Sequence, residues 1–163
     1  MRYPIGLQRG MAIAEIAVAA AVLAVGLVGV SAAFPSLGYA IQEGKQLSTA
    51  TFLATQRLEQ VRRARWEQGP PAVDELGVST SRLAAPMSGA VTTFPDEPAL
   101  PGSYAGYSRS VRIADCAAGC GGIARGDLRQ VTVSVTYRPM TAGGGFAAAG
   151  SRAATITMYL AQR

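Results

Sequence analysis

The positions of apolar and polar residues divide the chain into an apolar stretch, an amphipathic stretch and a region of strict alternation. From Ile16 to Phe34 no side chain is charged, and alanine, valine and leucine dominate. At ~1.5 Å per residue a helix of this length spans about 28 Å, close to the ~30 Å hydrocarbon core of a bilayer. The pattern therefore predicts a membrane-length helix near the N-terminus.

A helical stripe follows the apolar run. Apolar residues recur at spacings of three and four, and polar or charged residues occupy the other faces. Gly69-Pro70-Pro71 ends the pattern. Pro35 and Gly44 lie between the two stretches, so we expect a kink or local unwinding there. The stripe consists of Leu47, Ala50, Ala54, Leu58, Val61 and Ala64.

Period-two alternation in the C-terminal part predicts β-strands. Residues 128–138 and 154–161 each alternate between apolar and polar side chains. A weaker alternation from Tyr107 to Ile113 is interrupted on its apolar face by Arg109. Such alternation indicates strands with one buried and one solvated face, and three successive strands most simply form an antiparallel meander. The amphipathic helix is the available cover for its apolar face, which predicts an α+β fold.

A single carboxylate, Glu15, lies just inside the apolar helix. An acidic side chain costs about 2.5–3.5 kcal/mol at the centre of a membrane helix and less near its end, so its presence calls for a reason. Gly10 lies five positions upstream, behind a short leader whose only charged side chains are Arg2 and Arg9. By the positive-inside rule these arginines keep the leader in the cytoplasm, and the bulk of the chain lies across the membrane.

The leader, Gly10, Glu15 and the apolar run together resemble the class III signal of type IV prepilins and type II secretion pseudopilins. In that family a prepilin peptidase cuts after the glycine and methylates the new N-terminus. The resemblance implies a cut between Gly10 and Met11, with N-methylation of Met11. It also implies that Glu15 acts in subunit assembly by neutralising the cationic amine of a neighbouring subunit, while Gly26 and Gly29 let anchor helices pack closely.

The resemblance extends along the chain. The segments 21–30, 49–62 and 128–137 and the final strand look like those of PilV-type minor pilins and I-type pseudopilins. One departure is that Met11 stands where the family usually has phenylalanine. The family implies a pilin fold, in which a long helix packs on a small antiparallel sheet of about three strands. The implied partners are prepilin peptidase, other pilins or pseudopilins, and the inner membrane.

On this basis we divide the chain into five parts. Residues 1–10 form the leader, 11–34 the transmembrane and assembly helix, and 35–68 its amphipathic continuation. Residues 69–103 form a surface loop rich in proline and glycine, and 104–163 the antiparallel sheet. The expected function is that of a minor pilin or pseudopilin, held in the inner membrane by a single span with its C-terminal domain in the periplasm. It is then incorporated into a type IV pilus, or initiates one, or enters a pseudopilus.

Three other functions remain open. A type II secretion pseudopilin has the same leader and helix, and the sequence does not distinguish it from a pilin. A membrane-anchored binding domain would share the helix but leave Glu15 unexplained. A secreted binding domain would follow from an ordinary secretory signal, because Ser31-Ala32-Ala33 fits a signal-peptidase site, with Phe34 as the first mature residue.

The amino-acid composition limits which catalytic and metal-binding sites the chain can form. The chain has no histidine, which removes the Ser-His and Cys-His catalytic constellations and the commonest metal ligand, so we expect no enzyme, cofactor or metal. Cys116 and Cys120 are the only cysteines, and an extracytoplasmic location favours a disulfide between them over free thiols. Gly143-Gly144-Gly145 superficially fits a phosphate loop, but no βαβ unit surrounds it, so a hairpin loop is expected.

The basic residues allow two interpretations of the surface on which they lie. The formal net charge of +5 is too mild to indicate nucleic-acid binding by itself. The densest basic cluster lies on the amphipathic helix and its end, where it fits either a DNA-binding surface or a solvated face that meets acidic neighbours. We favour the second reading. The cluster consists of Arg57, Arg62, Arg63 and Arg65.

Overall fold

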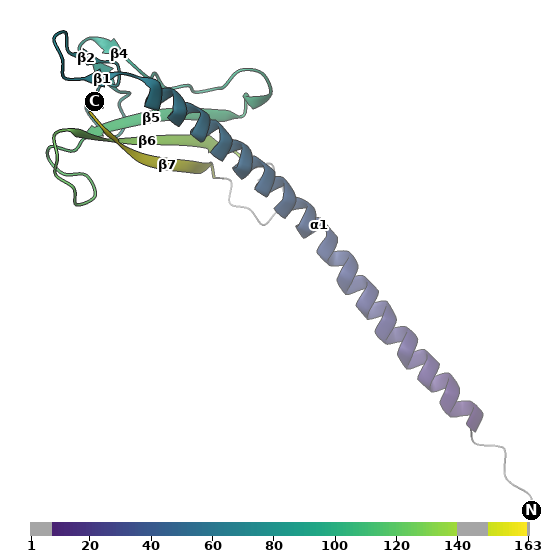
Figure 1. The fold of residues 1–163 in the computed structure, drawn as a ribbon. Helices are drawn as coiled ribbons and strands as arrows, with labels where there is room; N and C mark the ends of the chain where they lie inside the picture. Colours follow the sequence, from purple (N-terminus) through teal and green to yellow (C-terminus); the bar gives the residue numbers. More distant parts are fainter. Residues whose placement is uncertain (1–7, 140–149, 163) are drawn as a thin grey trace, which may run out of the picture. The chain divides into compact units, whose positions relative to one another are not determined.

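The computed structural model describes residues 8–139 and 150–162. It contains one long helix, α1 (Gln8–Arg63), and a three-stranded sheet (Figure 1). The strands are β5 (Tyr107–Asp115), β6 (Leu128–Tyr137) and β7 (Arg152–Ala161). The chain separates into two compact units, Met1–Gln42 and Glu43–Arg163. The α+β fold predicted from the sequence is confirmed.

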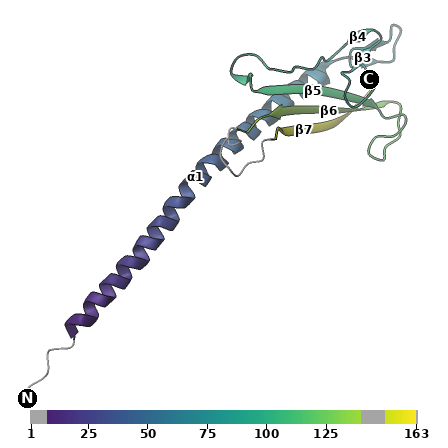
Figure 2. The same ribbon diagram turned by 180° about the vertical axis from the view of Figure 1, so that it is seen from behind.

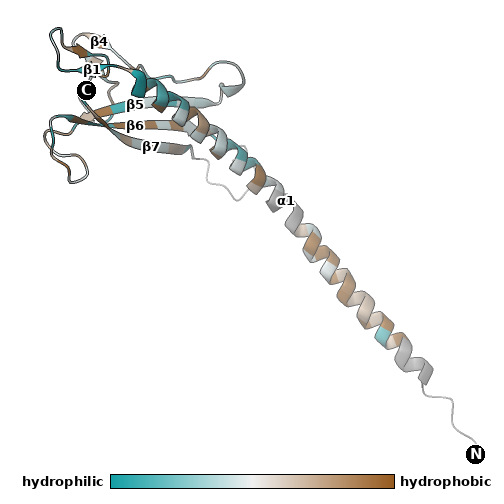
Figure 3. Ribbon diagram, viewed as in Figure 1, coloured by the Kyte–Doolittle hydropathy of each residue, from teal (hydrophilic) through white to brown (hydrophobic). Residues whose placement is uncertain are grey.

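The described part of the first unit is the N-terminal portion of α1. Within it, Ile13–Ala32 is long and apolar enough to cross a membrane, with a mean hydropathy of 2.5 (Figure 3). Such a segment fits a signal sequence or a single membrane anchor. Helix is assigned continuously through Pro35 and Gly44, so the local unwinding that we expected there does not occur. A proline removes one backbone hydrogen bond, and the bonds on either side hold the helix.

The hydrophobic core of the second unit lies between α1 and the sheet. Figures 1 and 2 show the C-terminal part of α1 running along one face of the three strands. Ala50 and Ala54 are fully buried on the helix side, and their small side chains permit a close approach to the sheet. The buried core includes Ala50, Leu53, Ala54 and Val61 from α1 with Val111, Ile113, Val131, Val133 and Val135 from the sheet.

The sheet is an antiparallel meander in the order β5-β6-β7, as the alternation predicted. Along β6 every second residue is buried, because successive side chains point to opposite faces of the sheet and one face packs against the core. The register is continuous in both pairs, from Tyr107↔Tyr137 to Asp115↔Arg129 and from Leu128↔Ala161 to Tyr137↔Arg152. The polar residues of the alternation therefore line the opposite, solvated face.

The segment between α1 and β5 is more structured than a surface loop. It contains two short antiparallel pairs and one turn of 3₁₀ helix. It also contributes Leu76, Phe94 and Leu100 to the core. Since α1 ends at Arg63, the first of these strands begins within the stretch that we assigned to the helix. The elements are β1 (Trp66–Glu67), β2 (Val73–Asp74), β3 (Met87–Ser88), β4 (Val91–Thr92) and η1 (Gly102–Tyr104).

Candidate functional site

The residues of the predicted cleavage and assembly site lie at the start of α1. This helix begins at Gln8, so Gly10 and Met11 lie within its first turn. Glu15 follows Met11 by four residues, which places it about one turn further along the same side of the helix. The bond between Gly10 and Met11 is thus part of a helical backbone.

Glu15 lies on an otherwise apolar and exposed surface. Large apolar side chains between Ile13 and Val30 are 59% to 74% exposed, so this part of α1 is not covered by other described residues. A helix that is apolar on all sides and uncovered requires an apolar surrounding such as lipid or other helices. None of the ion pairs within residues 8–139 and 150–162 involves Glu15. A countercharge for its carboxylate would therefore come from outside the described chain.

Gly26 and Gly29 lie three residues apart on this exposed helix. Apart from its chain neighbours and the backbone of the same stretch of helix, a Cβ atom added at either position would meet no described atom within 4 Å. The small size of these two residues is therefore not required by any contact with the described residues. It leaves backbone surface open, which is the feature that lets two helices approach closely in a membrane.

The basic cluster at the end of α1 is largely neutralised by acidic side chains. Arg62 pairs with Glu59 at 2.8 Å, and Arg65 pairs with Glu75 at 2.9 Å. Arg57 lies 4.0 Å from Glu97 and 5.3 Å above the ring of Phe94, and burial lowers the pKa of its guanidinium. Of the four arginines in the cluster, Arg63 makes no ion pair with the described residues. This pairing fits the solvated-face reading better than a DNA-binding surface.

Arg109, which interrupts the apolar alternation of β5, has a structural role. Its side chain is 8% exposed and points into the core. The Nε group donates a 2.6 Å hydrogen bond to Glu97, and Nη1 donates one of 3.2 Å to the carbonyl of Leu53 in α1. The bond from Arg109 holds the pKa of the Glu97 carboxyl below its usual range. Arg109 therefore ties β5, the preceding segment and α1 together.

Arg129 forms a similar link at the other end of the sheet. Its guanidinium donates two hydrogen bonds to Asp74, at 2.6 and 2.8 Å, and lies 4.2 Å from the centre of the Trp66 ring. Asp74 also accepts bonds from the backbone N–H groups of Leu76 and Gly77. No local pattern in the sequence marks this group, because Arg129 lies far from Trp66 and Asp74 in the chain and a charged residue at a core-facing position of a strand is unusual.

Cys116 and Cys120 form a disulfide at the end of β5, as the extracytoplasmic assignment favoured. Both residues are buried, and their Cα atoms are 4.9 Å apart. The backbone N–H of Cys116 donates to Leu128, and its carbonyl accepts from Arg125. The disulfide thus closes a small turn that is fastened to the start of β6, which is a structural role.

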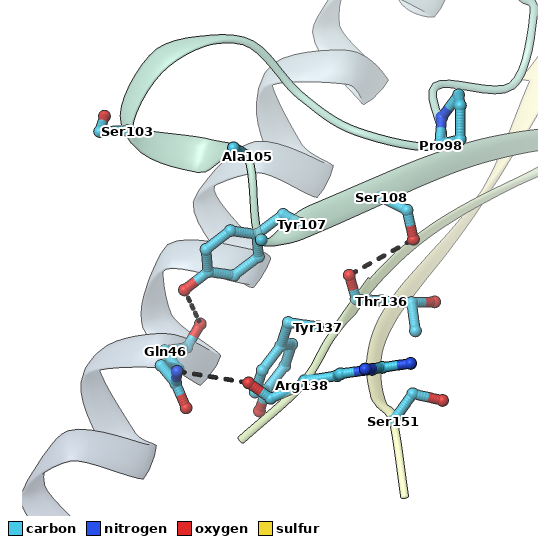
Figure 4. Close-up of a pocket in the computed structure, with 11 residues that line it drawn as sticks. Gln46, Pro98, Ser103, Ala105, Tyr107, Ser108, Thr136, Tyr137, Arg138 and Ser151 are labelled. Atoms are coloured by element: carbon cyan, nitrogen blue, oxygen red, sulfur yellow. Dashed lines mark hydrogen bonds between the residues drawn. The ribbon is translucent and has the colours of Figure 1, made fainter. Parts of the chain in front are cut away.

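A shallow cleft of about 640 Å³ opens beside the N-terminal end of β5 (Figure 4). The Tyr107 hydroxyl donates to the carbonyl of Gln46 over 3.5 Å, and Gln46 Nε2 donates to the carbonyl of Arg138 over the same distance. Both bonds tie α1 to the sheet. Among the described lining side chains there is no carboxylate or thiol, and Arg138 is the only charged one. These described residues therefore do not place a nucleophile beside a base.

No group of three or more histidine, cysteine, aspartate or glutamate residues in the described part of the chain could hold a metal ion. The features without a partner among the described residues are instead the apolar segment Ile13–Ala32 of α1 and Glu15, the carboxylate within it. The leader residues 1–7 and the predicted hairpin loop at Gly143-Gly144-Gly145 lie outside the described residues. No protein-family model, curated protein or solved structure matches this chain.

Proposed function

We propose that this protein is a minor pilin, a fibre subunit that is matured by prepilin peptidase and joins a type IV pilus through its N-terminal helix. One observation carries the proposal. Glu15 is a lone carboxylate on an uncovered apolar helix, five positions after Gly10. An anchor alone has no use for such a charge, whereas a subunit that assembles through its anchor does.

Maturation would create the countercharge that Glu15 lacks. A cut between Gly10 and Met11 frees the backbone amine of Met11, which is cationic at neutral pH. Met11 lies four positions before Glu15 on the same helix. When two helices pack with an axial offset, the amine of one subunit reaches the carboxylate of the next, and the pair offsets much of the cost of placing either charge in an apolar surrounding.

Close packing of the helices would depend on their small residues. Gly26 and Gly29 leave open backbone surface that no side chain of the described residues covers. In a fibre this surface allows neighbouring helices to approach and bury the apolar side chains that are exposed in the isolated chain. The apolar helix would serve first as a membrane anchor and later as the core of the fibre.

The globular unit would lie in the periplasm while the subunit is in the inner membrane, and on the fibre surface afterwards. The disulfide between Cys116 and Cys120 fits this oxidising location. The proposed role is structural, and it requires neither a catalytic residue nor a cofactor. A type II secretion pseudopilin would use the same helix, charge and disulfide, and is the second candidate function.

Processing of the leader tests the proposal. Full-length protein is co-expressed with a prepilin peptidase, either unchanged or as Gly10→Ala, and Gly6→Ala serves as the matched control in the same leader. We expect the unchanged chain and Gly6→Ala to be shortened and Gly10→Ala to stay at full length. Normal shortening of Gly10→Ala would exclude prepilin peptidase as the maturing enzyme.

A further inference from the structure

The two edges of the sheet differ in their hydrogen bonding. The outward edge of β5 is occupied by the preceding segment: Arg109 exchanges two backbone bonds with Glu97, and the carbonyl of Tyr107 accepts from Leu100. At the far end, the carbonyl of Ile113 accepts from the N–H of Ser79, and its own N–H donates to the Ser79 hydroxyl. This edge is closed to another strand.

The pairing of β7 shows which of its backbone groups point outward. The N–H of Gln162 donates to the carbonyl of Asp127, just beyond the paired ends of β7 and β6. Because bonded and non-bonded pairs alternate in an antiparallel ladder, the even-numbered residues of β7 bond to β6. The odd-numbered residues direct their N–H and C=O groups away from the sheet. These are Ala153, Thr155, Thr157, Tyr159 and Ala161.

This outward edge has no backbone partner in the described chain. It also lacks the features that normally protect an edge. Residues 153–161 include no charged residue and no proline, and the register with β6 contains no bulge. Arg152, the one charged residue of β7, pairs instead with Glu43 of α1. A long edge without such protection is a template for pairing with another strand.

An apolar row lies beside the open edge. On the core side of β7, Ile156, Met158 and Leu160 are only partly buried, whereas the residues opposite the first two on β6, Val133 and Val131, are completely buried. The core therefore covers β6 fully and β7 incompletely. One more strand beside β7 would cover this row with its own apolar side chains and satisfy the outward backbone groups.

We propose that β7 accepts one extended strand from a different polypeptide chain. The backbone edge calls for an extended segment, and the half-covered apolar row calls for apolar residues at every second position. The neutral edge favours a segment without charge at its centre. Recognition of this kind takes its affinity from main-chain hydrogen bonds and its specificity from alternate side chains.

A second copy of this chain does not fit the site as well, an argument that rests on the proposed fibre function. Because its β5 edge is closed, a second copy could offer only its own β7. Pairing of β7 with β7 is two-fold symmetric and closes after two subunits, whereas a fibre grows through contacts between different surfaces. The occupant is therefore a different subunit with a free strand.

Amide hydrogen exchange with a strand peptide tests the proposal. The full-length protein is kept in detergent, and the probe is a peptide of alternating threonine and valine with a lysine at each end. A peptide of the same length interrupted by prolines is the control. We expect the first peptide to slow exchange at Thr155, Thr157 and Tyr159 by about tenfold or more, with little change at Ile156 and Met158, and we expect the proline peptide to have no effect.

A pair of variants at one outward position tests the same site. Thr157→Pro removes an outward N–H that the sheet does not use, and Thr157→Val keeps it. Circular dichroism should show that both variants fold. We expect Thr157→Pro to bind the strand peptide about tenfold more weakly and Thr157→Val to bind it within about twofold of the unchanged protein.

Two results would overturn the proposal. One is that the strand peptide leaves the outward amides unprotected. The other is concentration-dependent protection of the same amides without any peptide, which would show that a second copy occupies β7. Either result is independent of leader processing, because cleavage after Gly10 is measured at the opposite end of the chain. Failure of strand binding is thus distinguishable from failure of the proposed function.

Discussion

The guanidinium of Arg129 donates a hydrogen bond to each carboxylate oxygen of Asp74, at 2.6 and 2.8 Å, although the two residues are 55 positions apart. This contact fastens the segment that follows α1 to the central strand of the sheet. The Arg129 side chain is only 9% exposed, so few water molecules could replace its partner. Asp74 therefore contributes to stability chiefly by preventing an unpaired buried charge.

Loss of the Asp74 charge should destabilise the globular unit. We expect Asp74→Asn to lower the free energy of unfolding by about 2–3 kcal/mol, because Arg129 stays buried with a weaker partner. The matched control is Glu59→Gln, which breaks the exposed pair with Arg62 and should cost less than about 1 kcal/mol. Denaturant titration of the detergent-solubilised protein measures both. If both variants lose the same free energy of unfolding, the buried pair stabilises the protein no more than the exposed pair.

Stability should fall in acid. Hydrogen bonds from Arg129 and Arg109 lower the pKa values of Asp74 and Glu97, respectively. In the unfolded chain these carboxyls titrate near pH 4, so between that pH and the lower folded-state pKa values the unfolded state binds more protons. The stabilisation is present above about pH 4 and is lost as the pH falls through the folded-state pKa values. Melting temperatures measured from pH 7 to pH 2.5 should drop below about pH 4, and less steeply in Glu97→Gln.

Gly77 should be intolerant of a side chain. Its φ is +68°, and a Cβ atom would lie 2.5 Å from the carbonyl carbon and oxygen of Met87, whose backbone bonds to Val78. Gly89 has a similar φ of +59° but open space around it. We expect Gly89→Ala to cost about 1–2 kcal/mol of stability for the backbone conformation and Gly77→Ala clearly more, because the clash adds to it. Thermal unfolding of the two variants separates these effects, and equal costs would rule out the clash.

The sequence predicted the regular parts of the fold well. The alternation in residues 128–138 and 154–161 corresponds closely to β6 and β7, and the apolar run lies within α1. These predictions succeeded because the periodicity of a strand or helix is visible over a short window. The disulfide could also be predicted from the sequence, since Cys116 and Cys120 had no other cysteine with which to pair.

The segment between α1 and the sheet was harder to predict. Leu76 and Phe94 join the core from irregular backbone, so no periodicity marks them as buried. In the sequence pattern, Arg109 only interrupts the apolar alternation of its strand. Its partners Glu97 and Leu53 come from two other parts of the chain, so the pattern does not show its structural role. Contacts of this kind depend on tertiary structure, and a single sequence gives no local pattern for them.

Neutralising Glu15 should separate maturation from assembly. We expect Glu15→Gln to be cleaved normally, because the cut lies at Gly10, but to be reduced about tenfold or more in fibres, since the Met11 amine of its neighbour has no countercharge. The measurement compares the amount of protein in sheared fibres with the amount in membranes. Glu59→Gln, a charge loss on the same helix outside the apolar segment, is the control. Unchanged incorporation of Glu15→Gln would remove the charge-pairing role.

The identity of the mature N-terminus tests the central claim most directly. The protein is extracted from membranes of cells with and without a prepilin peptidase, and its intact mass and N-terminal sequence are determined. The account predicts a peptidase-dependent start at Met11 that carries the mass of one added methyl group. A chain that begins at Phe34, as ordinary signal peptidase would leave it, or one that still begins at Met1 in the presence of the peptidase, would contradict the account.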